Sequence, residues 1–386
     1  MNTQELYNLS PVLRLMLMGL IVAAGPLAWV WLRSRNAPVA RRLQVLTLVT
    51  LFLTFDLVVF GAFTRLTDSG LGCPDWPGCY GHASPVGAKQ HIDAAQTAMP
   101  TGPVTHPKAW IEMIHRYLAT GVGVMILTLA ITSWIERKRV NISPWWPAFT
   151  LVWVCLQGAF GALTVTMKLF PAIVTMHLLG GMVLLALLKV QSFRYAQVLG
   201  DPSAPCKVAV PVNLRWLVLL TFALLWLQIA LGGWVSTNYA VLACTDFPAC
   251  QNSLWPPMDF QQGFTIWREL GEGPNDTNIS FAALTAIHYV HRLSAYVVFA
   301  AMLLLTVKLY RLPALRTQAQ WAGGLALLQL ATGLGNVLLG WPLAAAVLHT
   351  AGAAAMVIVL TGIVCCTKKE VVASSRAKSG TSRLTA

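Results

Sequence analysis

Charged residues are scarce in this sequence. Asp, Glu, Lys and Arg make up 11% of its 386 residues, only 14 residues are acidic, and hydrophobic residues reach 56%. A soluble domain carries roughly a quarter charged residues, because its surface must be solvated. The scarcity of charge therefore excludes an ordinary soluble domain and predicts an integral membrane protein whose main partner is the lipid bilayer.

Two further absences narrow the function. A His-Glu-x-x-His motif is absent, which argues against a zinc peptidase. There is also no concentrated basic patch, because the residues behind the net charge of +13 are spread over several loops. This distribution is typical of loops that contact anionic lipid headgroups, and we expect no nucleic-acid partner.

The sequence contains many long apolar runs. A run of about 20 apolar residues crosses about 30 Å of hydrocarbon as a helix. The sequence predicts an all-α protein with nine such spans, at residues 12–32, 45–64, 110–133, 147–166, 172–193, 214–236, 283–307, 320–338 and 344–366.

The loops between these spans indicate an orientation. Most of the 27 lysines and arginines lie in segments 33–42, 134–144, 189–215, 308–318 and 367–386. Positive residues accumulate on the cytoplasmic side, so the alternate segments are predicted to be external. The N-terminus is then outside and the C-terminus is cytoplasmic.

The first span is the least certain element of this topology. A signal peptide is the alternative, but Glu5 precedes the span and no small-residue cleavage site comes before Arg33. We therefore expect an uncleaved helix. The N-terminus also does not resemble an Arg-rich transit peptide, which favours a bacterial inner (plasma) membrane.

The chain contains an internal repeat. Four segments recur in the same order at a nearly constant offset: GAFTRLTDSGLGCPDWPGC with GGWVSTNYAVLACTDFPAC, EMIHRYLA with HYVHRLSA, LQGAFGALTV with LQLATGLGNV, and MHLLGG with LHTAGA. We interpret the chain as two tandem four-helix transmembrane bundles. The extra N-terminal helix and its linker occupy 1–42, the halves 43–195 and 212–366, the cytoplasmic linker 196–211, and the basic tail 367–386. An even number of spans per half gives both copies the same orientation.

Four histidines lie inside spans at repeated positions. His115 and His177 belong to the first half, and His291 and His349 are their equivalents in the second. Ionisable residues are costly inside a membrane, so each is a functional hypothesis. The alternative is a buried histidine that hydrogen-bonds between helices, but duplication of the whole pair makes a shared ligand function the better interpretation. His82, His91 and His106 lie in an external loop and are expected to be solvated.

Two imidazoles on facing helices suit haem iron, which accepts axial histidines within a helical bundle. Zinc is the alternative, but it requires further ligands nearby. Arg116 and Arg292 directly follow two of the histidines. They are candidates to pair with haem propionates, or they extend to the membrane interface as solvated cations.

The most informative difference between the halves lies one helical turn before the first histidine. Glu112 precedes His115, whereas His288 occupies the equivalent position before His291. A buried carboxylate beside a cofactor can exchange protons, so Glu112 is the candidate catalytic residue. A structural hydrogen bond to a neighbouring helix is the alternative. His288 either supports or competes with His291 for ligation, and Asp56 is a weaker candidate.

Eight cysteines fall into two groups. Cys73 and Cys79, and likewise Cys244 and Cys250, form external Cys-x5-Cys loops rich in turn residues. A local disulfide in each loop is the first interpretation, Cys73–Cys79 and Cys244–Cys250; a redox-active thiol pair or a metal site are alternatives. The remaining cysteines, Cys155, Cys206, Cys365 and Cys366, are expected to be reduced.

Together these motifs resemble the haem A synthase family. The external Cys-x5-Cys loops, the Glu-x-x-His-Arg of the first half, the histidine in MHLLGG, the His-Arg of the second half and the closing LHT occur in the family's order. The resemblance covers about 43–366. The extra helix at 12–32 departs from it, because the family core has eight helices.

The resemblance implies an enzyme that oxidises the C8 methyl of haem O to a formyl group by successive hydroxylations, with water as the oxygen source. It implies that His115 and His177 flank the substrate haem, that His291 and His349 ligate haem b, that Glu112 is the family's required glutamate, and that Cys73 and Cys79 are its external cysteine pair. The implied partners are the haem O supplying enzyme and an electron acceptor, with a homo-oligomer as a further option. A non-catalytic dihaem electron carrier or haem chaperone for a terminal oxidase is the alternative function.

Overall fold

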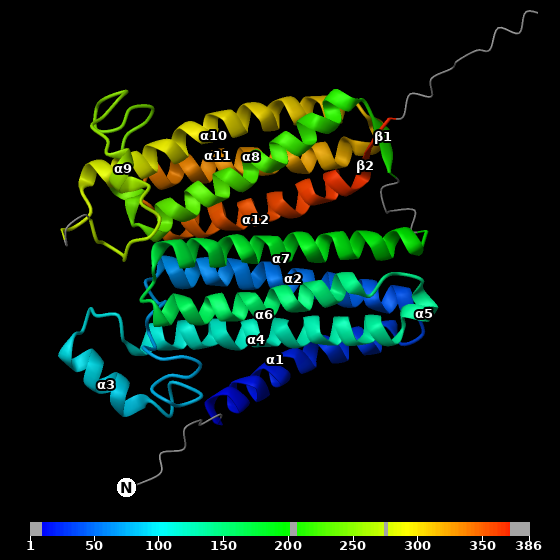
Figure 1. The fold of residues 1–386 in the computed structure, drawn as a ribbon, viewed down its shortest axis with the longest axis horizontal. Coiled ribbons are helices and arrows are strands. Elements are labelled where there is room, and N and C mark those ends of the chain that lie inside the picture. The colour runs from blue at the N-terminus through cyan, green and yellow to red at the C-terminus, as the bar shows by residue number, and fades with distance from the viewer. Residues whose placement is uncertain (1–9, 201–206, 274–276, 371–386) are drawn as a thin grey trace, which may run out of the picture.

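The computed structural model describes residues 10–200, 207–273 and 277–370 (Figure 1). Within these residues, nine helices are long and apolar enough to cross a membrane. They are α1 (Ser10–Ser34), α2 (Val39–Leu66), α4 (His106–Ile135), α6 (Trp145–Thr166), α7 (Pro171–Val198), α8 (Val212–Thr237), α10 (Phe281–Tyr310), α11 (Arg316–Leu338) and α12 (Leu343–Cys366). Each contains one predicted span, so the prediction of a nine-span, all-α membrane protein is confirmed.

Polar residues cap two of the helices, α4 and α10, outside their apolar runs. Thr105 precedes α4 and its hydroxyl accepts a hydrogen bond from Lys108 N, and Ser280 accepts one from Ala283 N at the start of α10. Such caps satisfy backbone N–H groups that have no partner within the helix. A span predicted from hydropathy does not include these polar turns, so the predicted spans are shorter than the observed helices.

Two rings of helices make up the membrane region (Figure 1). In the first, α2 contacts α4 and α7, and α6 contacts the same two helices. The same pattern joins α8, α10, α11 and α12. The two rings meet where α7 and α2 pack against α12, and α7 packs against α8.

Equivalent positions of the repeat meet between the two rings. The Arg65 guanidinium donates to the carbonyl oxygen of Ser236, which is the equivalent residue of the second copy, at 2.5 Å. The Tyr239 hydroxyl donates to Asp68, again its own equivalent, at 2.7 Å. Contacts between equivalent positions arise where a two-fold axis passes through an interface. The packing therefore has the relation expected of two copies in the same orientation.

Helix α1 lies at the edge of the molecule against α4 and α2 (Figure 1). Its contact with α4 is close, because a Cβ atom on Gly19 would lie 2.4 Å from the Thr120 side chain and one on Gly121 would lie 2.8 Å from Val22. Small residues allow helix backbones to approach within a membrane. The extra helix is thus packed against the helix that carries Glu112 and His115.

Several short elements lie outside the spans. They are α3 (Lys89–Ala98), α5 (Arg137–Val140), α9 (Phe260–Gly263), the 3-10 helices η1 (Ala240–Ala243) and η3 (Pro313–Leu315), and strands β1 (Val208–Val210) and β2 (Thr367–Lys369). The sequence analysis predicted none of them. Hydropathy detects only elements long enough to cross a membrane, and these are short and partly polar.

The strands β1 and β2 pair in parallel and connect the segment between the halves to the end of α12. They lie at the end of the molecule opposite α3 (Figure 1). Arg215 strengthens this connection by donating to the Val364 carbonyl at 2.9 Å and to Thr367 Oγ1 at 2.6 Å. Cys206 and residues 371–386 of the predicted tail lie outside the described residues.

Candidate functional site

The structure brings the four repeated histidines together in two pairs. His115 on α4 and His177 on α7 lie within electrostatic range of each other, as do His291 on α10 and His349 on α12. All four are only half-buried, although each belongs to a membrane-spanning helix. Each ring of helices therefore contains one pair of imidazoles from two different helices.

Each imidazole packs against a glycine of a third or fourth helix. A Cβ atom would lie 3.0 Å from His115 Cε1 if built on Gly61, and 2.9 Å from His291 Cε1 if built on Gly232. The corresponding distance is 3.4 Å for His177 at Gly161. It is also 3.4 Å for His349 at Gly333. The absence of a side chain at these glycines leaves room for the Cε1 edge of each ring, and this arrangement is repeated in both halves.

The donor sets fit haem better than zinc. Each pair supplies two imidazoles, the number of axial ligands that a six-coordinate haem takes. A tetrahedral zinc site takes three or four protein ligands. Among residues 10–200, 207–273 and 277–370, no three His, Cys, Asp or Glu side chains are grouped so that they would hold a metal ion. The half-buried rings and the glycines beside them suit a flat ligand placed between two helices.

A disulfide-bonded loop lies over the first ring of helices. Cys73 and Cys79 are joined, with their Cα atoms 4.9 Å apart. The Asp75 carboxylate closes the loop by accepting hydrogen bonds from Tyr80 N and Gly81 N, at 2.6 and 2.7 Å. The predicted local pairing of these cysteines agrees with this geometry.

Glu112 connects α4 to this loop. Its Oε2 accepts a hydrogen bond from Cys73 N at 2.7 Å, and its Oε1 accepts one from the Arg116 guanidinium. The side chain is buried, with 4% of the residue exposed. The candidate catalytic carboxylate is therefore fixed against the backbone of the disulfide loop, one turn from His115.

Arg116 and Arg292 occupy equivalent places beneath the two loops. Arg116 donates to the carbonyl oxygens of Asp75 and Gly78, among others. Arg292 donates to those of Asp246 and Ala249, at 2.9 and 2.7 Å. Both guanidinium groups thus hold a loop in place, a function that the sequence analysis did not consider. The suggested pairing with haem propionates stays a prediction.

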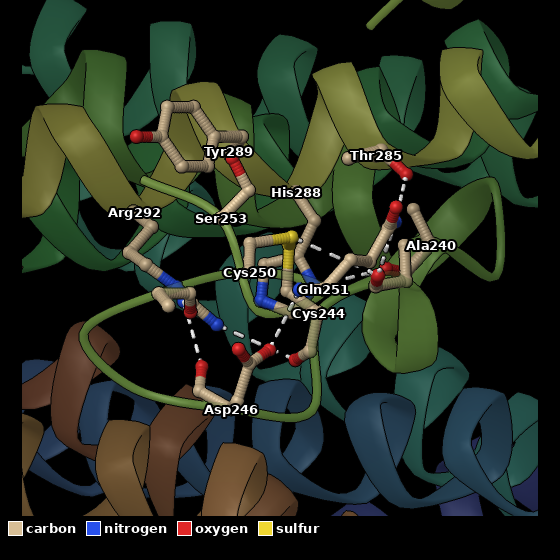
Figure 2. The surroundings of a disulfide bond; sticks show 12 residues. Ala240, Cys244, Asp246, Cys250, Gln251, Ser253, Thr285, His288, Tyr289 and Arg292 are labelled. Carbon is tan, nitrogen blue, oxygen red and sulfur yellow. Dashed lines mark hydrogen bonds between the residues drawn. A yellow bond between two sulfur atoms is a disulfide. The ribbon is translucent and has the colours of Figure 1, made fainter. Parts of the chain in front are cut away.

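The second loop repeats the first with different side chains beneath it (Figure 2). Cys244 and Cys250 are joined, and the Asp246 carboxylate accepts from Gln251 N and Asn252 N. These hydrogen bonds lower the pKa of Asp246 below its ordinary value, and the bond from Asn252 N has the largest effect.

His288 takes the place of Glu112 beneath this second loop. Its Nδ1 lies 3.1 Å from the Ala240 carbonyl oxygen. The ring is beside the disulfide and directed toward η1 (Figure 2). This hydrogen bond suits a supporting residue, and His291 is the histidine that lies near His349.

Three polar residues around the second histidine pair were not predicted from the sequence. Thr332 contacts His349. Gln228 contacts His291 and accepts a hydrogen bond from Ser294. Alignment of the repeat contains the signal, because the equivalent positions in the first half are Phe160, Leu57 and Leu118. These positions carry no charge and match no motif, so they did not stand out.

The remaining candidates lie away from the histidine pairs or have other partners. Asp56 is an exposed residue of α2. His106 is the first residue of α4, is half-buried and contacts Asp93 at 2.6 Å, whereas the exposed His91 stacks on Tyr80. The thiols expected to be reduced are free in the described residues: Cys155, Cys365 and Cys366.

Comparison with known proteins identifies the family. Residues 44–361 match the model of the family described as cytochrome oxidase assembly protein. The chain belongs to this family. The matched residues span both rings of helices and begin after α1. The extra helix is thus outside the part of the chain that the family model describes.

Several relatives carry the name haem A synthase. One from Shewanella oneidensis is 37% identical over 321 residues, which cover 82% of this chain and 93% of the relative. One from Caulobacter sp. is 28% identical over 357 residues, covering 86% and 96%. One from Mesorhizobium japonicum is 28% identical over 318 residues, covering 78% and 84%. The resemblance inferred from the motifs is confirmed.

Proposed function

We propose that this protein is a haem A synthase that oxidises the C8 methyl of haem O to a formyl group within the membrane. Family membership and the names of the relatives support an enzyme of haem A synthesis. The observation that carries the specific proposal is the buried Glu112, which is bonded to the Cys73 backbone one turn from His115. The second half has His288 at this position, so the halves differ where chemistry needs a proton acceptor.

We assign the two histidine pairs to two haems. His115 and His177 hold the substrate haem O, and His291 and His349 hold haem b. Haem b, when bound, supplies one-electron transfer, which the oxidation of a methyl group requires. The assignment is supported by two half-buried imidazoles in each ring and a glycine beside each imidazole.

We assign to Glu112 the function of a proton acceptor. Each hydroxylation of the methyl group with oxygen from water releases protons and electrons, so a nearby carboxylate that accepts protons promotes it. Two hydrogen bonds orient the Glu112 carboxylate, but an ionised carboxylate offers about four acceptor sites. The free sites can orient a water molecule, while Arg116 stabilises the ionised form through charge.

The disulfide loops close the ends of the two haem sites. Arg116 and Arg292 anchor these loops through carbonyl oxygens, so the loops keep their positions when a haem enters. We place both loops on the external side of a bacterial inner membrane, with the C-terminus in the cytoplasm, because positive residues are concentrated in the opposite loops. The partners are then the haem O supplying enzyme and an electron acceptor in the same membrane.

The test is pigment analysis in a host that makes haem O. Membranes containing the parent chain should yield haem A or its hydroxylated precursor, identified by chromatography and mass spectrometry. Glu112→Gln should yield little of either, and the matched variant His288→Gln should retain both. If the parent yields neither pigment while both haem spectra are present, the protein is a dihaem carrier or haem chaperone and the proposal is wrong.

A further inference from the structure

The two histidine pairs differ in the partners of their Nδ1 atoms. A histidine binds iron through one ring nitrogen, and the partner of the other nitrogen sets the tautomer and the orientation of the ring. In the second half both Nδ1 atoms have polar partners. In the first half the Nδ1 atoms of His115 and His177 are buried without any hydrogen-bond partner.

Thr332 determines the tautomer of His349. Its Oγ1 lies 2.9 Å from His349 Nδ1 and donates to the Leu328 carbonyl oxygen of its own helix at 2.8 Å. Because the hydroxyl proton is used in that bond, the hydroxyl oxygen accepts from Nδ1–H. A neutral imidazole with its proton on Nδ1 has a free lone pair on Nε2, which is the form that binds iron.

Gln228 holds His291 in a comparable way. Its carboxamide nitrogen lies 3.1 Å from His291 Nδ1 and donates to the His291 carbonyl oxygen, also at 3.1 Å. Ser294 donates to the carboxamide oxygen and fixes the group from the other side. These contacts fix the orientation of the His291 ring, whereas the Thr332 hydroxyl also sets the tautomer of its histidine.

The first half has apolar side chains at all three equivalent positions. Phe160 replaces Thr332, Leu57 replaces Gln228, and Leu118 replaces Ser294. The glycines recur, because a Cβ atom on Gly161 or on Gly333 would lie at the same 3.4 Å from the neighbouring imidazole. A polar partner at Nδ1 is thus present in the second half and absent in the first.

We propose that Thr332 is a positioning residue that makes His349 a strong, permanent haem ligand and that Gln228 holds the His291 ring in place, whereas the unpartnered His115 and His177 are weak ligands that let a haem enter and leave. The proposal rests on the proposed function, because only a substrate haem has to be exchanged. A hydrogen-bond acceptor at Nδ1 makes the imidazole more basic, and loss of such a partner lowers metal affinity about 10- to 100-fold. The same chemistry predicts a different haem affinity in each half.

The experiment compares Thr332→Val with Thr332→Ser in the full chain. Valine has the shape of threonine without an acceptor, whereas serine keeps the hydroxyl. A His115→Ala background restricts the signal to the second-half haem, and a host that makes haem b but no haem O removes any dependence on activity. The readouts are the rate of haem transfer to apomyoglobin and the midpoint potential of the haem b.

Thr332→Val should release haem about 10- to 100-fold faster and shift the midpoint potential to more positive values, because a less basic ligand stabilises ferric iron less. Thr332→Ser should behave as the parent. Gln228→Leu, which introduces the first-half residue, should also release haem faster, because the His291 ring loses the side chain that orients it, and provides a second variant if Thr332→Val does not accumulate. Parent-like release rates and potentials in the valine and leucine variants would overturn the proposal.

The reciprocal variant addresses the first half. Phe160→Thr adds an acceptor near His177 and should slow haem release from an otherwise unchanged chain, while Phe160→Val, of equal size, should not. Equal release from both variants contradicts the inference. A parent chain that holds haem b but makes no haem A contradicts the proposed function alone, since neither measurement uses turnover.

Discussion

The two halves of this protein share a scaffold and differ at a few side chains. Each has a disulfide loop closed by an Asp carboxylate, an arginine that binds the loop carbonyls, and two histidines beside glycines. Near the loop, the first half has Glu112 where the second has His288. Next to the histidine Nδ1 atoms, the second half has polar side chains, whereas the Nδ1 atoms of the first half have no hydrogen-bond partner. The two halves thus contain similar sites that differ at a few side chains, and our proposal assigns substrate chemistry to the first and cofactor retention to the second.

The largest expected effect comes from removing the carboxylate that only the first half has. Glu112→Gln keeps the size of the side chain but cannot accept a proton, so haem A formation should fall about 10²- to 10⁴-fold. The measurement is haem A per unit of protein in membrane extracts. His288→Gln is the control and should fall far less; equal losses would remove the distinction between the halves.

Haem b binding tests the assignment of the second pair. His291→Ala should abolish the haem b spectrum of the second half, because it removes one of two axial ligands. His288→Ala should retain the spectrum, since its ring bonds the Ala240 carbonyl. Reduced-minus-oxidised difference spectra of purified protein decide between them. The reverse result would show that His288 is the ligand and that the repeat alignment is misplaced there.

The disulfide loops should differ in importance. Breaking either disulfide with a Cys→Ser change removes a short-loop crosslink that stabilises a fold by about 2 kcal/mol. Cys73→Ser should reduce haem A formation more than Cys244→Ser, because the Cys73 backbone N–H binds Glu112. Thermal stability and pigment yield, measured together, separate the two effects. Equal activity at equal stability would contradict a special function of the first loop.

The smallest effects are expected at the glycines beside the histidines. Gly232→Ala places a methyl group 2.9 Å from His291 Cε1, so the ring must shift. Gly333→Ala places one at 3.4 Å from His349 Cε1, close to ordinary contact. Haem b content should therefore fall more for Gly232→Ala than for Gly333→Ala. A greater loss from Gly333→Ala would mean that ring contact does not limit haem binding.

Much of the fold was predictable from the sequence because the membrane constrains it. A spanning segment must satisfy its own backbone hydrogen bonds, so an apolar run of sufficient length is a helix. All nine predicted spans lie within observed helices, and the repeat placed His115, His177, His291 and His349 at equivalent depths. The short elements were missed because their conformation depends on neighbours: β1 exists only because residues 367–369 lie beside it.

The candidate site was predictable in its ligands and less so in its contacts. Ionisable residues within apolar runs are easily recognised in a sequence, so Glu112 and the four histidines could be predicted as site residues. For Arg116 the sequence left a haem propionate or the membrane interface as alternatives, and it did not predict that the guanidinium reaches the carbonyl oxygens of a loop more than thirty residues away. Thr332 and Gln228 carry no charge, so nothing in composition or spacing marked them.

The amino-acid sequence by itself determined the membrane class, the nine helices, the internal repeat and the repeated histidines. These features depend on local composition and on comparison of the chain with itself. The tertiary structure decided which polar atom each side chain meets: Glu112 the Cys73 backbone, Arg116 the loop carbonyls, and His349 the Thr332 hydroxyl. Such contacts join separate elements, and the relative rotation and depth of packed helices, which no apolar run specifies, decide whether they form.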